Sequence, residues 1–149
     1  MATFRQIIQK SFIAASNALR VASVALTEIF KQYSAAATDV NGVTWKDLLD
    51  KSTITKDTRI IGFKVTKGGA WAGNPKIRIV DGAGTTKLFP PADEWVMATD
   101  FTDATQKDFD YPLNVALADG YKFQFRSSNA GDGAGETLAL DNLDVIEVG

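Results

Sequence analysis

The chain has 149 residues, of which 45% are hydrophobic and 23% charged, and its net charge is −2. This length and composition are typical of one globular domain. The sequence contains no His and no Cys, which excludes Ser-His-Asp and Cys-His catalysis, disulfides, and thiolate zinc, haem and iron–sulfur sites. The net negative charge disfavours nucleic acid as a partner. Carboxylate chemistry, Ca²⁺ or Mg²⁺ binding, or no chemistry at all remain; the motifs considered below favour the last, a non-enzymatic protein with no catalytic residue, metal or cofactor.

A long helix with a coiled-coil seam is predicted for residues 1–37. Residues 4–33 contain neither Gly nor Pro, and apolar side chains recur there at alternating spacings of four and three. These side chains are the candidate assembly residues: Ile8, Phe12, Ala15, Leu19, Ala22, Leu26, Ile29 and Tyr33. The flanking positions lack the charge pairs of a free two-stranded coil. Two alternatives stay open: the helix packs on its own domain, or it associates with other copies or docks on another surface.

Charge separates this segment from the rest of the chain. Four Lys or Arg and one Glu give residues 1–37 a net charge of +3, whereas twelve Lys or Arg and seventeen Asp or Glu give residues 38–149 a net charge of −5. The apolar run over residues 12–30 is interrupted by Asn17, Arg20 and Glu28. Each central charge costs roughly 2.5–3.5 kcal/mol on membrane insertion. We therefore expect neither a membrane span nor a secretory signal.

Residues 38–57 are predicted to connect the helix to a second domain. Thr44 and Asp47 have the spacing of a capping box, which predicts a short helical turn through Leu48 and Leu49.

After residue 58 the hydrophobic period changes to two, which is typical of strands with one buried face. The alternating runs lie at 61–65, 76–80, 113–117, 121–126, 138–141 and 144–148. A phase slip through Ile146 and Val148 predicts a bulge or a strand covered on both faces. Asp119-Gly120 predicts a hairpin, and the run over residues 93–110 predicts a crossing between sheets. The predicted fold is α+β but mainly β: a long N-terminal helix, then an antiparallel, jelly-roll-like β-sandwich over residues 58–149.

Carboxylates are the catalytic candidates that the composition leaves. Asp100, Asp103, Asp108 and Asp110 are close in sequence, but they match no acid–base motif. The Gly-rich run over residues 129–136 does not have the ligand spacing of an EF-hand loop. We interpret the first as a solvated acidic segment and the second as a loop between sheets.

Trp71 is the candidate ligand contact. It lies among small residues in a predicted loop over residues 68–74, where an exposed indole could stack on a sugar or fill a partner's pocket. The alternative is an indole that folds back over the edge of the sandwich. Trp95, between Glu94 and Val96, is predicted to lie in the core.

A seamed N-terminal helix followed by a small acidic β-sandwich resembles the auxiliary virion proteins of tailed bacteriophages, namely head-decoration, head-fibre and short-fibre proteins. This resemblance implies a homo-oligomeric structural protein, a trimer, that contacts other capsid or tail proteins and is assembled into the virion in the host cytoplasm. The stretch over residues 135–145 is also similar to the last strands of carbohydrate-binding jelly rolls. That similarity implies an alternative function, a glycan-binding module for adhesion to surface glycans.

Overall fold

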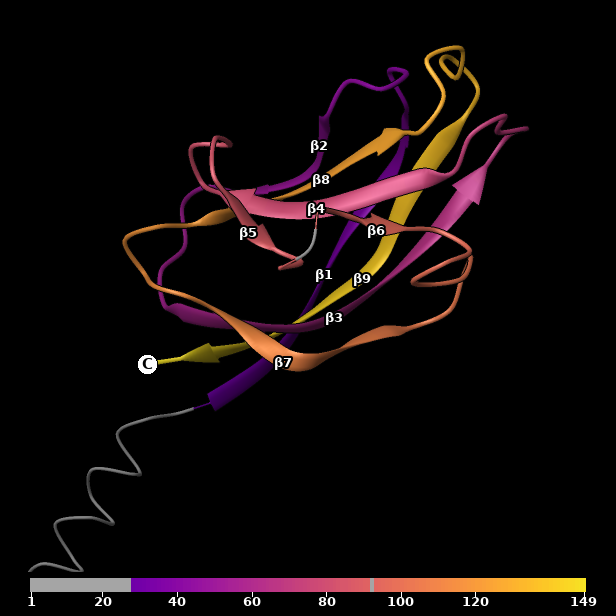
Figure 1. The fold of residues 1–149 in the computed structure, drawn as a ribbon. Coiled ribbons are helices and arrows are strands. Elements are labelled where there is room, and N and C mark those ends of the chain that lie inside the picture. Colours follow the sequence, from indigo (N-terminus) through magenta and orange to yellow (C-terminus); the bar gives the residue numbers. More distant parts are fainter. Residues whose placement is uncertain (1–27, 92) are drawn as a thin grey trace, which may run out of the picture.

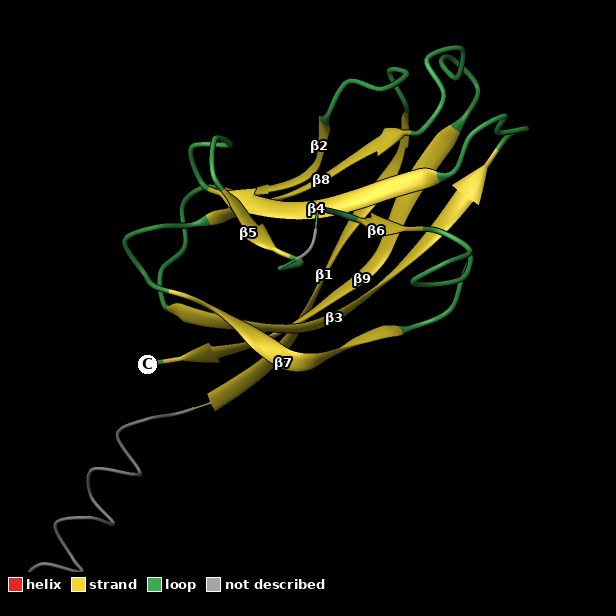
Figure 2. Cartoon of the chain, in the orientation of Figure 1, coloured by secondary structure: helices red, strands yellow, loops and turns green. Residues whose placement is uncertain are grey.

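The structure is a computed structural model that describes residues 28–91 and 93–149. Nine strands form two antiparallel sheets that pack face to face (Figures 1 and 2). In chain order the strands are β1 (Glu28–Asp39), β2 (Lys46–Lys51), β3 (Asp57–Gly68), β4 (Pro75–Asp81), β5 (Lys87–Phe89), β6 (Trp95–Val96), β7 (Lys107–Val115), β8 (Tyr121–Ser127) and β9 (Thr137–Val148). One sheet has the order β1-β9-β3-β7. The other has the order β2-β8-β4-β5, with β6 on β4.

The described part of the chain contains no helix, so the predicted α+β class is wrong and this part is all-β. Ile29 and Tyr33, the last two residues of the predicted seam, lie in β1 and pair with β9. The pairing with β9 outweighs the helix propensity of this segment, because propensity is a weak prior against tertiary contacts. The other seam residues lie outside the described residues: Ile8, Phe12, Ala15, Leu19, Ala22 and Leu26.

The predicted helical turn after Thr44 is also wrong, because this segment forms β2. Lys46–Lys51 pairs with β8, Leu48 is buried in the core, and Leu49 is half-buried and packs against the same core after a register shift between Asp47 and Leu49. Two adjacent leucines suit a helix as well as a strand. The segment forms a strand because it pairs with the edge of β8 that β4 leaves open, and β8 is then hydrogen-bonded on both sides.

The predicted antiparallel β-sandwich is confirmed, and its core comes from the alternating runs. Tyr121, Phe123 and Phe125 of β8 are fully buried, as are Ile77 and Ile79 of β4. Phe63 of β3 lies at the centre of an aromatic cluster. Its ring contacts those of Trp95, Phe101, Phe109 and Phe123, with centroids 5.2–6.1 Å apart. Trp95 therefore lies in the core, as predicted.

Two bulges shift the buried positions from those of a simple alternation. A register shift between Ile60 and Gly62 turns Ile60 into the core and leaves Ile61 half-buried on the other face. In β9 the slip lies between Leu140 and Asn142 rather than near Ile146. As a result Glu147, and not Ile146, occupies a buried position.

The connections cross between the sheets more often than the turn signals indicate. The predicted hairpin at Asp119-Gly120 is wrong, because β7 belongs to one sheet and β8 to the other. The predicted crossing over residues 93–110 is confirmed, since β6 and β7 lie in different sheets. No helix of the described residues is long and apolar enough to cross a membrane.

Candidate functional site

Trp71 and the Gly-rich loop lie together at one end of the sandwich, where Asp132 holds three loops. The Asp132 carboxylate accepts hydrogen bonds from the Ala72 and Gly73 amides, each at 2.9 Å, and from the Ser127 hydroxyl at 2.5 Å. Its backbone carbonyl accepts a bond from the Gly42 amide. The hydrogen bond from Ser127 is the largest cause that holds the pKa of Asp132 below its usual value, and the two amides lower it further. Burial raises this pKa, but by less than the hydrogen bonds lower it. The carboxylate is thus occupied by the protein's own donors.

Trp71 is folded back onto the protein. Its indole N–H donates a 2.8 Å hydrogen bond to the Gly68 carbonyl, and its half-buried ring packs against the hydrophobic core. This geometry matches the alternative that the sequence left open for this residue. The indole N–H is not free to hydrogen-bond a ligand.

The four clustered aspartates do not form one site. Asp100 accepts a hydrogen bond from the Val96 amide and Asp103 accepts one from the Lys67 amide, so both brace loops. Asp108 and Asp110 lie in β7. Within the described residues, no group of three or more acidic side chains is placed to hold a metal ion.

The outer face of the second sheet carries a polar network centred on Trp45. The guanidinium groups of Arg78 and Arg126 lie 4.2 and 4.7 Å from the centroid of its ring. Glu94 pairs with Arg126 at 3.0 Å and with Lys76 at 2.6 Å. Burial opposes ionisation of Glu94, but these two partners lower its pKa overall. Glu94 thus carries the one carboxylate among the three cations named here, and Arg78 instead donates from its Nε to the Gln124 side-chain oxygen at 2.9 Å.

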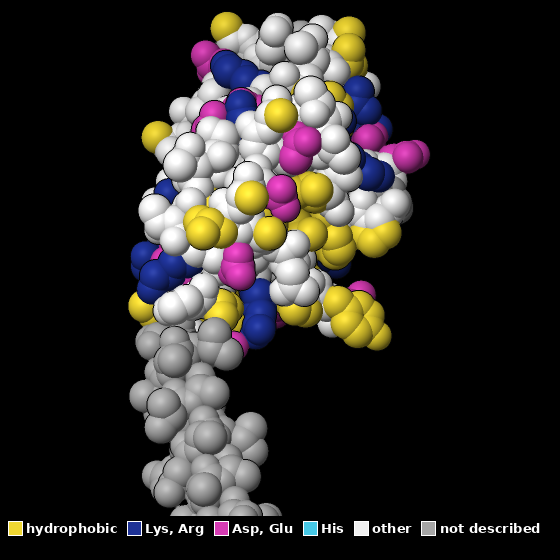
Figure 3. All heavy atoms as spheres, turned by 90° about the vertical axis from the view of Figure 1, so that its left-hand side faces the viewer, with side chains coloured by type: hydrophobic (Ala, Val, Ile, Leu, Met, Phe, Trp, Pro, Cys, Tyr) yellow, Lys and Arg dark blue, Asp and Glu magenta, His cyan; other side chains and the backbone are white. Residues whose placement is uncertain are grey.

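The opposite end of the sandwich exposes apolar side chains at the start of β1. The first five residues of β1, Glu28–Gln32, are all exposed, and they include Ile29 at 37% and Phe30 at 57% of full exposure. Figure 3 shows apolar side chains interspersed with charged ones toward this lower end. Phe30 lies opposite Ile146 of β9, which is half-buried.

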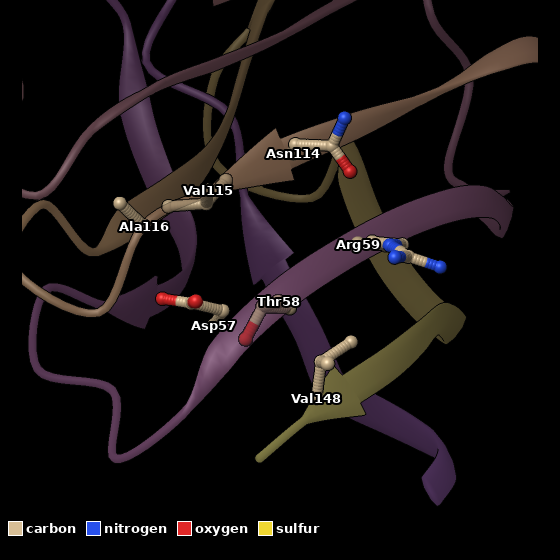
Figure 4. A pocket seen from close by; sticks show the side chains of 7 residues that line it. All are labelled: Asp57, Thr58, Arg59, Asn114, Val115, Ala116 and Val148. Carbon is tan, nitrogen blue, oxygen red and sulfur yellow. The ribbon is translucent and has the colours of Figure 1, made fainter. Parts of the chain in front are cut away.

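Beside these residues the ends of three strands enclose a shallow hollow of about 320 Å³, here named the basal groove (Figure 4). It is lined by Asp57, Thr58, Arg59, Asn114, Val115, Ala116 and Val148. Asp57 accepts a hydrogen bond from the Leu117 amide, and Arg59 pairs with Glu28 at 2.8 Å. The two charged side chains of this groove are thus already partnered. The groove offers contact area rather than reactive groups.

The middle of β7 arches away from β3, its neighbour in the sheet. Ile60 pairs with Leu113 and Gly62 pairs with Asp108, so one residue of β3 faces the four residues 109–112 of β7. Such bulges are frequent next to functional sites, because they redirect side chains. Here Phe109 turns inward, whereas Tyr111 projects and is 80% exposed. Figure 1 shows β7 bending along the edge of its sheet.

The arch forms one wall of a second hollow, the aromatic groove, of about 200 Å³. It is lined by Phe89, Pro90, Pro91, Trp95, Lys107, Asp108, Phe109, Asp110 and Tyr111. The rings of Phe89, Trp95 and Phe109 contact one another pairwise, with centroids 4.9–5.1 Å apart. This groove could not be predicted from the sequence, because its rings come from three separate segments. The available signal was Pro112, since a Pro inside an alternating run marks an edge strand or a bulge.

Comparisons with known proteins identify no family. No protein-family model matches the sequence, and no curated protein matches it either. The nucleoplasmin-like N-terminal domain of Drosophila FKBP39 superposes with a TM-score of 0.37 at 17% identity, covering 80% of this chain and 89% of that one. The infectious bursal disease virus VP2 subviral particle gives 0.34 at 14% identity, covering 83% of this chain and 31% of that one. This viral neighbour is a capsid protein, but not one of a tailed bacteriophage. These likenesses are weak.

Proposed function

We propose that this chain is a non-enzymatic structural protein of a bacteriophage virion, attached through its N-terminal segment, with the β-sandwich projecting from the particle. The observation that carries this proposal is the exposed start of β1. Ile29 and Phe30 lie there on a strand that is exposed along its first five residues. Successive strand residues point to opposite faces, so an apolar side chain is exposed on each side of this edge strand, where a partner could contact it.

The sequence before β1 supports the same direction of attachment. The apolar seam residues Leu19 and Leu26 precede Ile29 in the chain, and residues 1–37 carry +3 against −5 for the remainder. Like-charged sandwiches placed side by side repel each other weakly, and salt screens that repulsion over ~8 Å. Burial of apolar area contributes roughly 25 cal/mol per Å². Attachment should therefore persist or tighten as salt rises to physiological concentration.

Light scattering on the full chain tests the self-association that this function needs. A homotrimer has three times the mass of one 16.1 kDa chain. Leu19→Asp and Leu26→Asp should each lower the mass toward that of one chain, because a buried carboxylate is strongly disfavoured. Trp71→Ala is the control and should keep the parent mass. A monomeric parent protein, or an unchanged mass in both Asp variants, would refute the self-association.

Mass spectrometry of purified phage particles tests the location. The chain should be recovered with the particles after salt washes. Recovery only in the soluble fraction would contradict a virion location, whatever the oligomeric state.

A further inference from the structure

We infer that the aromatic groove is a binding site for a neutral pyranose sugar, with Tyr111 as the stacking platform and Asp108 and Asp110 as acceptors for sugar hydroxyls. The site is distinct from Trp71 and lies on the β7 arch. The inference does not rest on the mode of attachment proposed above.

The first argument is the exposed ring. Tyr111 is 80% exposed at the tip of the arch, although most tyrosines cover part of the surface with their rings. The bulge at residues 109–112 holds it there, since those four residues face one residue of β3. An aromatic ring held away from the protein presents a flat apolar face, which suits the C–H face of a pyranose.

The second argument is the rigid wall behind Tyr111. Phe109 stacks on Trp95 at 5.0 Å between centroids, and Phe89 contacts both rings. Trp95 in turn contacts Phe63, a fully buried residue of the core. The wall is therefore formed before a ligand arrives, and binding does not have to order it.

The third argument is the unused polar groups at the rim. Neither Asp108 nor Asp110 makes a hydrogen bond or ion pair with the described residues, and neither does the ammonium of Lys107. By contrast, Asp100 and Asp103 in the preceding segment are both occupied by amides. Two free acceptors and one free donor match hydroxyl groups, which both donate and accept.

Charge and size narrow the class of ligand. Two carboxylates disfavour a phosphate or carboxylate ligand. A cation such as choline is attracted by the rings and by the carboxylates, but its quaternary ammonium has no N–H to donate to Asp108 or Asp110 and no acceptor for Lys107. A neutral ligand meets neither penalty. The volume of about 200 Å³ is below the roughly 300–1,000 Å³ of pockets for drug-sized molecules. It fits a single ring at the end of a glycan.

Saturation-transfer-difference NMR on the full chain tests the inference. The probes are methyl α-D-glucopyranoside, methyl α-D-mannopyranoside, methyl β-D-galactopyranoside and N-acetyl-D-glucosamine, each at millimolar concentration, with choline chloride as the cationic competitor. We expect saturation transfer from aromatic protons to the ring protons of at least one sugar. Tyr111→Ala should weaken that sugar's affinity about tenfold, and Asp110→Asn should also weaken it.

Matched controls separate the groove from the surface in general. Phe30→Ala removes another exposed ring, and Asp119→Asn neutralises another exposed aspartate without a side-chain partner in the described residues. Both variants should bind as the parent protein does. The inference is overturned by transfer to none of the sugars, by an affinity that is unchanged in Tyr111→Ala, or by transfer to choline alone. Because Tyr111→Ala should keep the parent mass in light scattering, failure here is distinguishable from failure of self-association.

Discussion

The phenol of Tyr33 donates a 2.5 Å hydrogen bond to the carboxylate of Glu147, which joins the exposed strand β1 to β9. Lys31 pairs with the same carboxylate at 2.7 Å, and the Lys51 ammonium lies 3.7 Å from the centroid of the Tyr33 ring. Burial, followed by the bond to Glu147, raises the pKa of Tyr33 to about 12. The pKa of Glu147 is lowered, mainly by the bond from Lys31 and to a smaller extent by the bond from Tyr33. This cluster anchors a strand that buries little of its own surface.

Tyr33→Phe should lower the free energy of unfolding by about 1.5 kcal/mol, the usual net value of a hydrogen bond to a charged group. Urea denaturation measures the change. Tyr111→Phe is the matched control, because its hydroxyl has no partner among the described residues. Equal stability of the two variants would show that the contact to Glu147 contributes nothing.

The same pair predicts how stability depends on pH. The folded pKa of Tyr33 lies above its ordinary value of 10.0, so its contribution is complete below pH 10 and is lost as the pH rises toward 12. The pKa of Glu147 is lowered, so its contribution is present above the ordinary carboxyl range and is lost as the pH falls. Thermal melts across the alkaline range should show a smaller loss in Tyr33→Phe than in the parent. The loss should not vanish, because burial also raises the pKa of Tyr121.

Asp132→Ala should lower the melting temperature and increase hydrogen exchange in the loops that it joins. The substitution leaves the amides of Ala72 and Gly73 and the Ser127 hydroxyl without their acceptor. Asp132→Asn should have a smaller effect, since one oxygen acceptor remains. Because the pKa of Asp132 is lowered, its contribution should fade on acidification. Asp119→Ala is the control. A melting temperature equal to the control's would mean that the loops hold together without this carboxylate.

Gly120→Ala and Gly84→Ala should differ in cost although both glycines have positive φ, +63° and +79°. A Cβ at residue 120 would meet the Ser52 carbonyl oxygen at 2.3 Å, whereas one at residue 84 meets only the Lys122 Cδ at 3.8 Å. We expect about 1–2 kcal/mol for Gly84→Ala from the left-handed backbone alone, and at least about 3 kcal/mol for Gly120→Ala from the added clash. Chemical denaturation measures both. Equal costs would contradict the close approach of the two backbones.

Truncation of the N-terminus should affect thermal stability differently depending on whether the chain starts at residue 28 or at Ser34. A chain that starts at residue 28 keeps β1 and should unfold cooperatively. A chain that starts at Ser34 loses half of the twelve residues of β1, including Lys31 and Tyr33, and should melt at a lower temperature. Circular dichroism melts of the two proteins check this. Matching melts would show that the first half of β1 is dispensable for the sandwich.

The strands that bury one full face could be predicted from sequence, whereas of the edge strands only the end of β7 could. Tyr121, Phe123 and Phe125 alternate with polar residues because one face of β8 packs on the core and the other faces outward. β1 is exposed along most of its length, so burial imposes no alternation on it. The spacing of four between Ile29 and Tyr33 then fits a helix equally well. Its true structure depends on β9, more than one hundred residues later in the chain.

The candidate sites show the same limit. Trp71 is conspicuous in the sequence because small residues surround it. In the structure, however, its ring packs against the protein's own core and its N–H is bonded to Gly68. The groove beside Tyr111 combines Phe89, Trp95 and Phe109, which no local spacing connects. The hairpin predicted at Asp119-Gly120 fails for a related reason, since a turn signal does not say which sheet receives the next strand.

The pairing of Glu28 with Val148 brings both ends of the sandwich's chain to the same place. A reporter domain fused after Gly149 would therefore emerge beside the start of β1 and compete for space with whatever binds there. The loop at Gly133 is at the opposite end, just before Thr137, which pairs with Asp39. A Cβ at Gly133 would meet nothing within 4 Å. A foreign peptide displayed on this scaffold should therefore be inserted beside Ala134, an exposed residue of that loop that is not among the donors to the Asp132 carboxylate, because surface loops tolerate insertion and the end where residues 28 and 149 lie stays free.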